Sequence, residues 1–598
     1  MSNVVFLKLR SNIIIPSDIL LAERECKSFF CELVQVNNYR DVEPTLPLGK
    51  ENVVRFTRDS FPIGFLGTNC LSNLHELVTS LSFIQEVWLS EENELARSLK
   101  NEYWIKRIKT LEGNFVCAIP LMTIAEILTY YNSSEITEND LKEIVECLSS
   151  GKNAEQMQFK KAVLKRITST PHVHGLHRYK AKFFPRMIRS FITSNRKRLC
   201  ANSSGKILLV DPFVGSGTAL VESMLLGIES VGIDIDLLSV AISQAKINLM
   251  QIDMSKLRQA VEKTISNYNS HVEPSIEPNY SFPPWIAKKF VRLKTSQEQE
   301  KYEREITLWQ KAISGTDSDE AQQILRVCLS DAITRKFNIR MMGTGVGRFA
   351  LEIRKQELST IMKANLGNLV HLASLVQVLK CVYNLKFQPS TVVHGTATNT
   401  HLPNESASII LTSPPYLPAS SGRENYLVGK SISITTLGLM TPDEIREMET
   451  KSIGSMRNNN NVDISGLPND VYQLYDWLNA DELRKIKAKP SVAYYRELKN
   501  ALLETHRILV QGGLAVYVIG RESVFYRFKT REILHKVACD KIFQEIAEQC
   551  GFIVDYRVDV QLDKKNSNAR PRSLDAFYET VFVLKKPIYS LRKLLTHR

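Results

Sequence analysis

Short, continuous apolar runs alternate with longer helical stretches in the middle and at the end of this chain. The runs have the length and composition of strands that are buried on both faces of a parallel sheet. They are residues 207–210, 231–234 and 409–411, and residues 491–586 again alternate strand, helix and strand. Residues 219–226, which follow the first run, read as a helix. This alternation predicts an α/β fold with a doubly wound sheet, formed by residues 166–254 and 391–586.

Three other regions have different patterns. Residues 1–165 predict an N-terminal α/β accessory domain with a possible role in nucleic-acid binding. Its elements are a strand at 4–9, a helix around 19–22, a second strand around 65–67 and an amphipathic helix around 121–128. The polar, basic stretch 153–170 predicts a linker. Residues 255–390 predict a charged helical insertion, and residues 417–490 predict an irregular insertion that is a candidate for target recognition.

Length and charge narrow the function. A chain of 598 residues is too long for one hydrophobic core. Its formal net charge of +13 and pI of about 9.1 favour a polyanionic partner, usually nucleic acid, although solubility alone is the alternative explanation.

The cysteine and histidine patterns do not indicate a metal site. The ten cysteines lack the two-residue spacing of zinc or redox motifs. His172, His174 and His177 are close in sequence, but no Cys or acid at metal-ligand spacing accompanies them, so we expect packing or hydrogen-bonding roles. No apolar run approaches the ~20 residues of a membrane span, and the N-terminus lacks a signal-peptide layout. We therefore expect a soluble, cytoplasmic protein without a metal; no pattern indicates an oligomeric state.

The loop after the first strand is glycine-rich. Gly215 and Gly217 allow a tight turn and a close approach to a ligand, and the following helix would present free backbone amides. About twenty residues on, the next strand ends in Asp234, whose carboxylate suits a sugar-hydroxyl clamp. A plain turn with Asp236 as a helix cap is the simpler alternative. A nicotinamide dinucleotide is disfavoured, because the third glycine of its fingerprint would fall at Leu220.

The second loop, Thr412-Ser413-Pro414-Pro415-Tyr416, is stiff. Two prolines fix φ and remove two amide donors, so carbonyls in the loop remain available as acceptors. The Ser413 side-chain oxygen and the Pro414 carbonyl can hold the two hydrogens of an exocyclic amine. Tyr416 offers a face for a base that has left its stack. Together, the two loops suggest methyl transfer from S-adenosylmethionine to a base amine.

These motifs resemble those of the amino-methylating DNA methyltransferases, and the Thr-Ser-Pro-Pro-Tyr form most resembles the cytosine-N4 branch. Residues 177–185 resemble the family segment beside the methionine end of the cofactor. The resemblance implies a Rossmann-like S-adenosylmethionine-dependent sheet, a double-stranded DNA partner, base flipping and a place in restriction-modification. It assigns catalysis to Ser413, Pro414, Pro415 and Tyr416. It assigns cofactor binding to Tyr179, Asp211, Phe213, Gly215, Gly217, Thr218, Asp234 and Thr412. Thr396 and Ser408 depart from acids common in the family.

Other readings remain open. The target could be adenine N6, because serine at the start of the motif does not exclude it. The N-terminal region has a faint similarity to tRNA guanine-N2 methyltransferases, which makes tRNA an alternative substrate, although those enzymes usually carry Asp where this chain has Ser413. A binding module without turnover is the third reading. No Pro-Cys dipeptide is present, so methylation of a pyrimidine ring carbon is disfavoured.

Three basic stretches are candidates for nucleic-acid contacts. The first carries four basic residues and no acid between 335 and 348, and arginine forks suit phosphate or guanine. The second is the asparagine-rich loop at 457–461, and the third lies before the last strand. A solvated loop is the alternative for the first stretch, and a disordered surface loop is favoured for the second. The residues are Arg335, Lys336, Arg340 and Arg348 in the first, Arg457 in the second, and Lys564, Lys565, Arg570 and Arg572 in the third.

Overall fold

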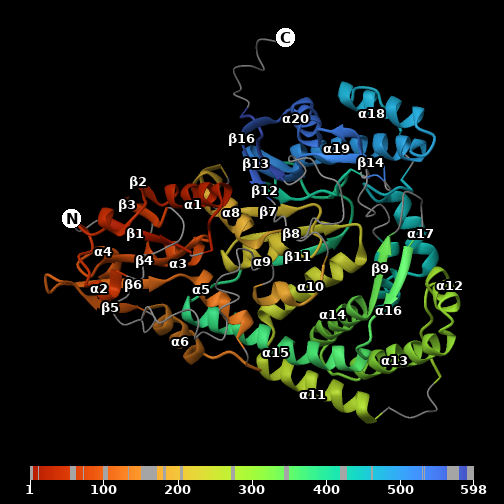
Figure 1. The fold of residues 1–598 in the computed structure, drawn as a ribbon, viewed down its shortest axis with the longest axis horizontal. Helices are drawn as coiled ribbons and strands as arrows, with labels where there is room; N and C mark the ends of the chain where they lie inside the picture. Colours follow the sequence, from red (N-terminus) through yellow and green to blue (C-terminus); the bar gives the residue numbers. More distant parts are fainter. Residues whose placement is uncertain are drawn as a thin grey trace.

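A seven-stranded sheet forms the centre of the computed structural model (Figure 1). The described residues are 4–10, 12–53, 62–71, 73–97, 105–131, 133–149, 171–179, 183–202, 206–270, 277–341, 349–417, 427–458, 462–527, 530, 532–561 and 578–588. The strand order is β11-β8-β7-β12-β13-β17-β16, and β17 runs antiparallel to its two neighbours. The strands are β7 (Leu208–Asp211), β8 (Glu229–Asp234), β11 (Ser390–His394), β12 (Ala407–Thr412), β13 (Leu509–Gly520), β16 (Ile553–Gln561) and β17 (Tyr578–Lys585).

Apolar side chains cover both faces of this sheet. Along β13, Leu514, Val516 and Val518 face one hydrophobic cluster, while alternate residues such as Ala515 and Tyr517 face a second. The first cluster includes α8 (Pro185–Asn202), α9 (Thr218–Leu225) and α10 (Leu237–Gln251). The second includes α19 (Ala488–Ile508) and α20 (Cys539–Gln549). The predicted Rossmann-like α/β fold is confirmed.

The N-terminal region contains a six-stranded antiparallel sheet of order β2-β3-β1-β4-β6-β5. Its strands are β1 (Val4–Leu9), β2 (Phe30–Val36), β3 (Gly64–Cys70), β4 (Ile84–Ser90), β5 (Lys106–Lys109) and β6 (Phe115–Pro120). The helices of the region are α1 (Pro16–Lys27), α2 (Lys50–Val53), α3 (Leu74–Ser80), α4 (Glu94–Arg97), α5 (Met122–Ala125) and α6 (Glu138–Ser149). Residues of this sheet and of the central sheet belong to one continuous apolar core, so the region does not have a wholly separate core. The helix expected around 121–128 is a short α-helix followed by a 3₁₀ turn at Glu126–Tyr130.

The first insertion is mainly helical, as expected, but it also contains a hairpin. Its helices are α11 (Met254–Ser270), α12 (Pro284–Arg292), α13 (Ser296–Ser314), α14 (Asp319–Lys336) and α15 (Leu358–Val382). Strands β9 (Phe337–Met341) and β10 (Phe349–Ile353) pair antiparallel directly after α14. The hairpin was not predicted, because each strand is only five residues long and carries polar residues.

The prediction that residues 417–490 are irregular was wrong for much of the described part. This part contains α16 (Ser431–Thr436), α17 (Pro442–Lys451) and α18 (Asn469–Ala480). A capping box between Thr441 and Glu444, with proline in the first turn, starts α17. That signal is present in the sequence. The predicted linker 153–170 lies outside the described residues. Among the described helices, none has both the length and the apolar content that crossing a bilayer requires.

Candidate active site

A cavity of about 290 Å³ opens at the carboxyl ends of β7, β8 and β12. The strand order reverses between β7 and β12, and open α/β sheets bind their ligands at such switch points. The glycine-rich loop after β7 and the Pro-Pro loop after β12 both line the cavity, although nearly two hundred residues separate them. Residues 337–339 of the hairpin and 427–433 of the second insertion contribute further wall.

The two glycines of the first loop have different surroundings. Both adopt positive φ, 52° at Gly215 and 73° at Gly217, which favours glycine. The Gly215 amide donates to Asp234 Oδ2 at 2.9 Å, and Gly215 lines the cavity. Gly217 lies against α10, where a Cβ would come within 2.9 Å of Ser243 Oγ. Gly215 therefore faces the cavity, and Gly217 allows the loop to pack.

Two carboxylates lie at the strand ends beside this loop. Burial raises the pKa of Asp211 to about 7, although hydrogen bonds from Thr412 and the Phe213 amide oppose the rise. Burial and the neighbouring Asp236 raise the pKa of Asp234 to about 6. Asp234 accepts one backbone amide on each oxygen and keeps capacity for further donors.

Hydrogen bonds hold the Pro-Pro loop in place. Thr412 is fully buried and donates to Asp211 Oδ1 at 2.6 Å, so it joins the two loops and supports the site rather than lining it. The Ser413 hydroxyl donates to the Val518 carbonyl at 3.4 Å, which leaves the lone pairs of its oxygen as acceptors. Tyr494 donates to the Pro415 carbonyl at 3.0 Å.

Tyr416 is half-buried, and its hydroxyl donates to Glu579 Oε1 at 2.6 Å. Glu579 lies on β17, and a Cβ on Gly520 at the end of β13 would come within 4.0 Å of the Tyr416 ring. The ring therefore has a defined position at the cavity wall.

Tyr179 lies beside the glycine-rich loop and also lines the cavity. Its hydroxyl is 2.9 Å from Ser239 Oγ, and its ring packs beside Gly215. The Lys430 ammonium group donates to the same hydroxyl and to Asp236, which also caps α10. Phe213 and Thr218 line the cavity as well.

The predicted nucleic-acid contacts have mixed outcomes. Lys336 was wrongly predicted, because it is 1% exposed and donates to the carbonyls of Arg354 and Gln356. Arg335 pairs with Asp331, whereas Arg340 is exposed on the hairpin and pairs with Glu352.

The flexible loop expected at 457–461 is packed at its described start. Arg457 is half-buried there, and Asn458 donates to the Ser452 carbonyl. Arg348, residues 459–461 and the third basic stretch lie outside the described residues.

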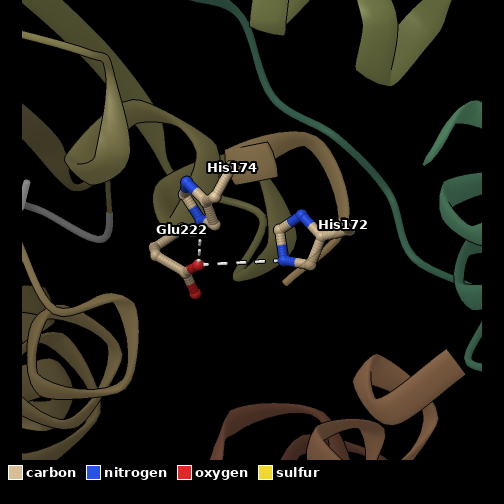
Figure 2. Close-up of side chains that lie close together, drawn as sticks. All are labelled: His172, His174 and Glu222. Carbon is tan, nitrogen blue, oxygen red and sulfur yellow. Dashed lines mark hydrogen bonds and ion pairs between the residues drawn. The ribbon is translucent and has the colours of Figure 1, made fainter. Parts of the chain in front are cut away.

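All three histidines are buried, but only His172 and His174 belong to a polar network with Glu222, whereas His177 lines the cavity. His174 Nε2 is 2.8 Å from Glu222 Oε1, and His172 Nε2 is 3.9 Å from the same oxygen (Figure 2). Arg189 donates to both Glu222 and Glu126, and His177 is 2.9 Å from Ser330 Oγ. No sequence pattern pointed to Glu222 as a partner of the histidines, because it lies on α9, 48 residues beyond His174.

Charge in this network is already balanced. The ionised arginines Arg10, Arg186 and Arg189 interact with the carboxylates of Asp18, Glu126 and Glu222. A divalent cation at the two imidazoles and Glu222 would add two uncompensated charges to a buried region, which is costly. The network thus favours the structural role that the sequence predicted for these histidines.

The buried ring of His172 predicts a pH effect on stability. Burial, reinforced by His174, lowers the pKa of His172 to about 3. The imidazole of His172 therefore takes up a proton more readily in the unfolded chain than in the folded chain. As a result, the folded state loses stability as pH falls from about 6.5 towards 3. We expect wild type to lose up to about 1.4 kcal/mol per pH unit in this window relative to His172→Asn. Asparagine is chosen because it tolerates the φ of 37° at this position.

Urea unfolding at several pH values measures this difference. The variant His394→Asn, which removes an exposed imidazole, controls for the loss of a histidine elsewhere. Parallel pH profiles for wild type and His172→Asn would refute the assignment.

The cavity residues fit S-adenosylmethionine. The cofactor is cationic at its sulfur and amine, and carboxylates line the cavity. Asp234 retains acceptors for the ribose hydroxyls, and the absence of a side chain at Gly215 leaves room beside the Tyr179 ring, 3.5 Å from where a Cβ would lie.

Comparison with known proteins gives two sequence matches. The chain matches no protein-family model. It is 41% identical over 90 residues to the type II methyltransferase M.MjaII of Methanocaldococcus jannaschii, and this match spans only 15% of either protein. It is 24% identical over 384 residues to the type II methyltransferase M.MvaI of Kocuria varians, covering 59% of this chain and 77% of M.MvaI. These matches confirm the predicted resemblance to methyltransferases and support S-adenosylmethionine as the cofactor.

Solved structures resemble the chain only distantly. A SAM-dependent methyltransferase from Methanosarcina mazei is 8% identical, with 64% of this chain and 93% of that chain covered and a TM-score of 0.22. The rRNA methyltransferase aviRa from Streptomyces viridochromogenes is 9% identical, with 71% and 94% covered and a TM-score of 0.26.

Proposed function

We propose that this chain, which is similar to two type II methyltransferases, methylates the N4 amine of a cytosine in double-stranded DNA. The observation that carries the proposal is the meeting of two loops in one cavity. The Ser413–Tyr416 loop supplies acceptors and an aromatic face, and the glycine-rich loop supplies a cofactor cradle. A net charge of +13 suits a polyanionic substrate.

The loop after β12 would act by holding the amine. The lone pair of cytosine N4 is delocalised into the ring, which makes the amine a weak nucleophile. Ser413 Oγ and the Pro414 carbonyl accept the two amino hydrogens, which orients the nitrogen lone pair. Because the Ser413 proton is directed to Val518, the oxygen presents acceptors and not a donor.

The base would stack on the ring of Tyr416. A cytosine inside a duplex cannot reach the cavity, so it must flip out of the helix. Its ring then loses the stacking on neighbouring bases and would stack on Tyr416 instead. Glu579 holds the phenol hydroxyl and so fixes the position of the far end of the ring before the base arrives. Bound S-adenosylmethionine would supply a methyl group on a sulfonium centre: the N–CH3 bond would form as the S–CH3 bond breaks, the sulfur would become a neutral thioether, and the methylated nitrogen would release one of its two hydrogens as a proton to water.

Asp211 would stabilise the arrangement without touching the base. Its carboxylate joins Thr412 to the start of the glycine-rich loop. The two loops are thus set at a constant separation, and in-line geometry depends on this separation.

A methyl-transfer assay with radiolabelled S-adenosylmethionine tests the proposal on duplex DNA and on total tRNA. Nucleoside mass spectrometry then identifies the product. N4-methylcytosine in DNA is expected. Detection of N6-methyladenine in DNA would identify adenine as the target base instead. Detection of N2-methylguanine in tRNA would identify tRNA as the substrate instead. Transfer to neither nucleic acid would refute an enzymatic role.

A further inference from the structure

Lys430 brings a half-buried positive charge into the cavity from the second insertion. Its ammonium group donates to Asp236 Oδ2 at 2.6 Å and to the Tyr179 hydroxyl at 3.0 Å. The same nitrogen lies 4.4 Å from the centre of the Tyr179 ring, and the side chain is 24% exposed. None of the sequence motifs pointed to this residue.

The ammonium group has a donor left for a ligand. An ammonium group carries three N–H donors, and the wall of the cavity takes two of them. Burial by itself would lower the pKa of Lys430, but Asp236 and Tyr179 outweigh it and raise the pKa above its ordinary value. The group is therefore charged throughout the physiological range.

The backbone before Lys430 is anchored. Glu449 on α17 is fully buried, and its Oε1 accepts the amides of Leu427 and Val428 at 2.7 and 3.1 Å. Ser431 Oγ, directly after Lys430, accepts from the Trp285 indole at 3.2 Å. Lys430 is thus presented from a braced segment and not from a free loop.

The surroundings indicate what this donor would bind. The other cations among the described cavity residues are Arg178 and Lys451, and both are exposed. Lys451 also pairs with Glu447 at 2.7 Å. The carboxylates in the cavity would repel an anionic group of a ligand. Among the described cavity residues, Lys430 is the partly buried cation that could bind such a group. S-adenosylmethionine has a single anionic group, its α-carboxylate.

We propose that Lys430 binds the α-carboxylate of S-adenosylmethionine, and that the second insertion thereby forms part of the cofactor site. This proposal rests on the proposed function, because it assumes that the cavity holds this cofactor. It predicts selectivity for cofactor analogues that keep the amino-acid end.

Calorimetric titration of the full chain with S-adenosylhomocysteine and with 5′-methylthioadenosine tests the proposal. The first ligand keeps the carboxylate, and the second lacks the whole amino-acid end. We expect Lys430→Met to weaken S-adenosylhomocysteine binding by about 10- to 100-fold, as for a lost charge-assisted hydrogen bond. Binding of 5′-methylthioadenosine should stay within about 2-fold of wild type.

Two further variants sharpen the test. Lys301→Met removes an exposed lysine on α13, paired with Glu357 outside the cavity, and should bind both ligands as wild type does. Lys430→Arg keeps the charge and should retain part of the affinity for S-adenosylhomocysteine.

The outcomes separate this proposal from the proposed function. Unchanged S-adenosylhomocysteine binding in Lys430→Met, or an equal loss for both ligands, would overturn the role of Lys430 alone. Failure of wild type to bind S-adenosylhomocysteine would overturn the proposed function and, with it, the Lys430 assignment.

Discussion

Tyr416→Ala should lower the rate of methyl transfer by at least about 100-fold while the chain still binds its cofactor. Stacking of one base on an aromatic ring contributes about 1–3 kcal/mol, and misplacement of the reacting amine adds a further loss. The cofactor cradle that we propose is the glycine-rich loop, so the affinity of the chain for its cofactor should change little. Single-turnover methyl transfer with saturating S-adenosylmethionine, together with calorimetric binding of S-adenosylhomocysteine, measures both effects.

Tyr416→Phe is the matched control, because it keeps the ring and removes only the hydroxyl that contacts Glu579. We expect it to lose less than about 10-fold in rate, because it keeps the ring on which the base is proposed to stack. Ser413→Ala should fall between the two, since the Pro414 carbonyl can still accept one amino hydrogen. If Tyr416→Phe were as slow as Tyr416→Ala, the hydroxyl and not the ring would be the essential group. Loss of cofactor binding in Tyr416→Ala would contradict the division between the two loops.

The centre of the sheet could be predicted from the sequence because its signals are local. β7 and β12 are short apolar runs, and each ends in a loop whose glycines or prolines restrict the backbone in a known way. Parallel strands place their carboxyl ends at one edge, so two such loops can be expected to meet there. The hydrogen bond from Thr412 to Asp211 is a direct result of that topology.

The residues that hydrogen-bond to the predicted site residues could not be predicted, because they lie far away in the sequence and belong to no recognisable motif. Glu579 is 163 residues from Tyr416, and Lys430 lies 194 residues from Asp236. Lys336 shows the opposite error: its place in a basic stretch suggested exposure, whereas the fold buries it against backbone carbonyls. Charge along a sequence does not reveal which carbonyls or carboxylates the fold will place nearby.

Gly217→Ala should destabilise the folded chain by about 2–5 kcal/mol. A non-glycine residue in the left-handed region costs about 1–2 kcal/mol, and a crowded contact adds about 1–3 kcal/mol. The new Cβ would lie 2.9 Å from Ser243 Oγ and 3.1 Å from Ser243 Cα, and the backbone atom cannot rotate away. The midpoint of urea unfolding, compared with wild type, measures the loss.

Gly215→Ala separates this packing effect from cofactor binding. Its φ is also positive, so the backbone cost is similar, but the nearest atom to its Cβ would be Tyr179 Cε1 at an ordinary 3.5 Å. We expect a smaller loss of stability, about 1–2 kcal/mol, and about a 10-fold weaker affinity for S-adenosylhomocysteine, because the methyl group enters the cavity. The two glycines thus have different positions within one motif: Gly217 is packed against α10, and Gly215 faces the cavity. Equal effects of both variants on stability would contradict this division, as would unchanged cofactor affinity in Gly215→Ala.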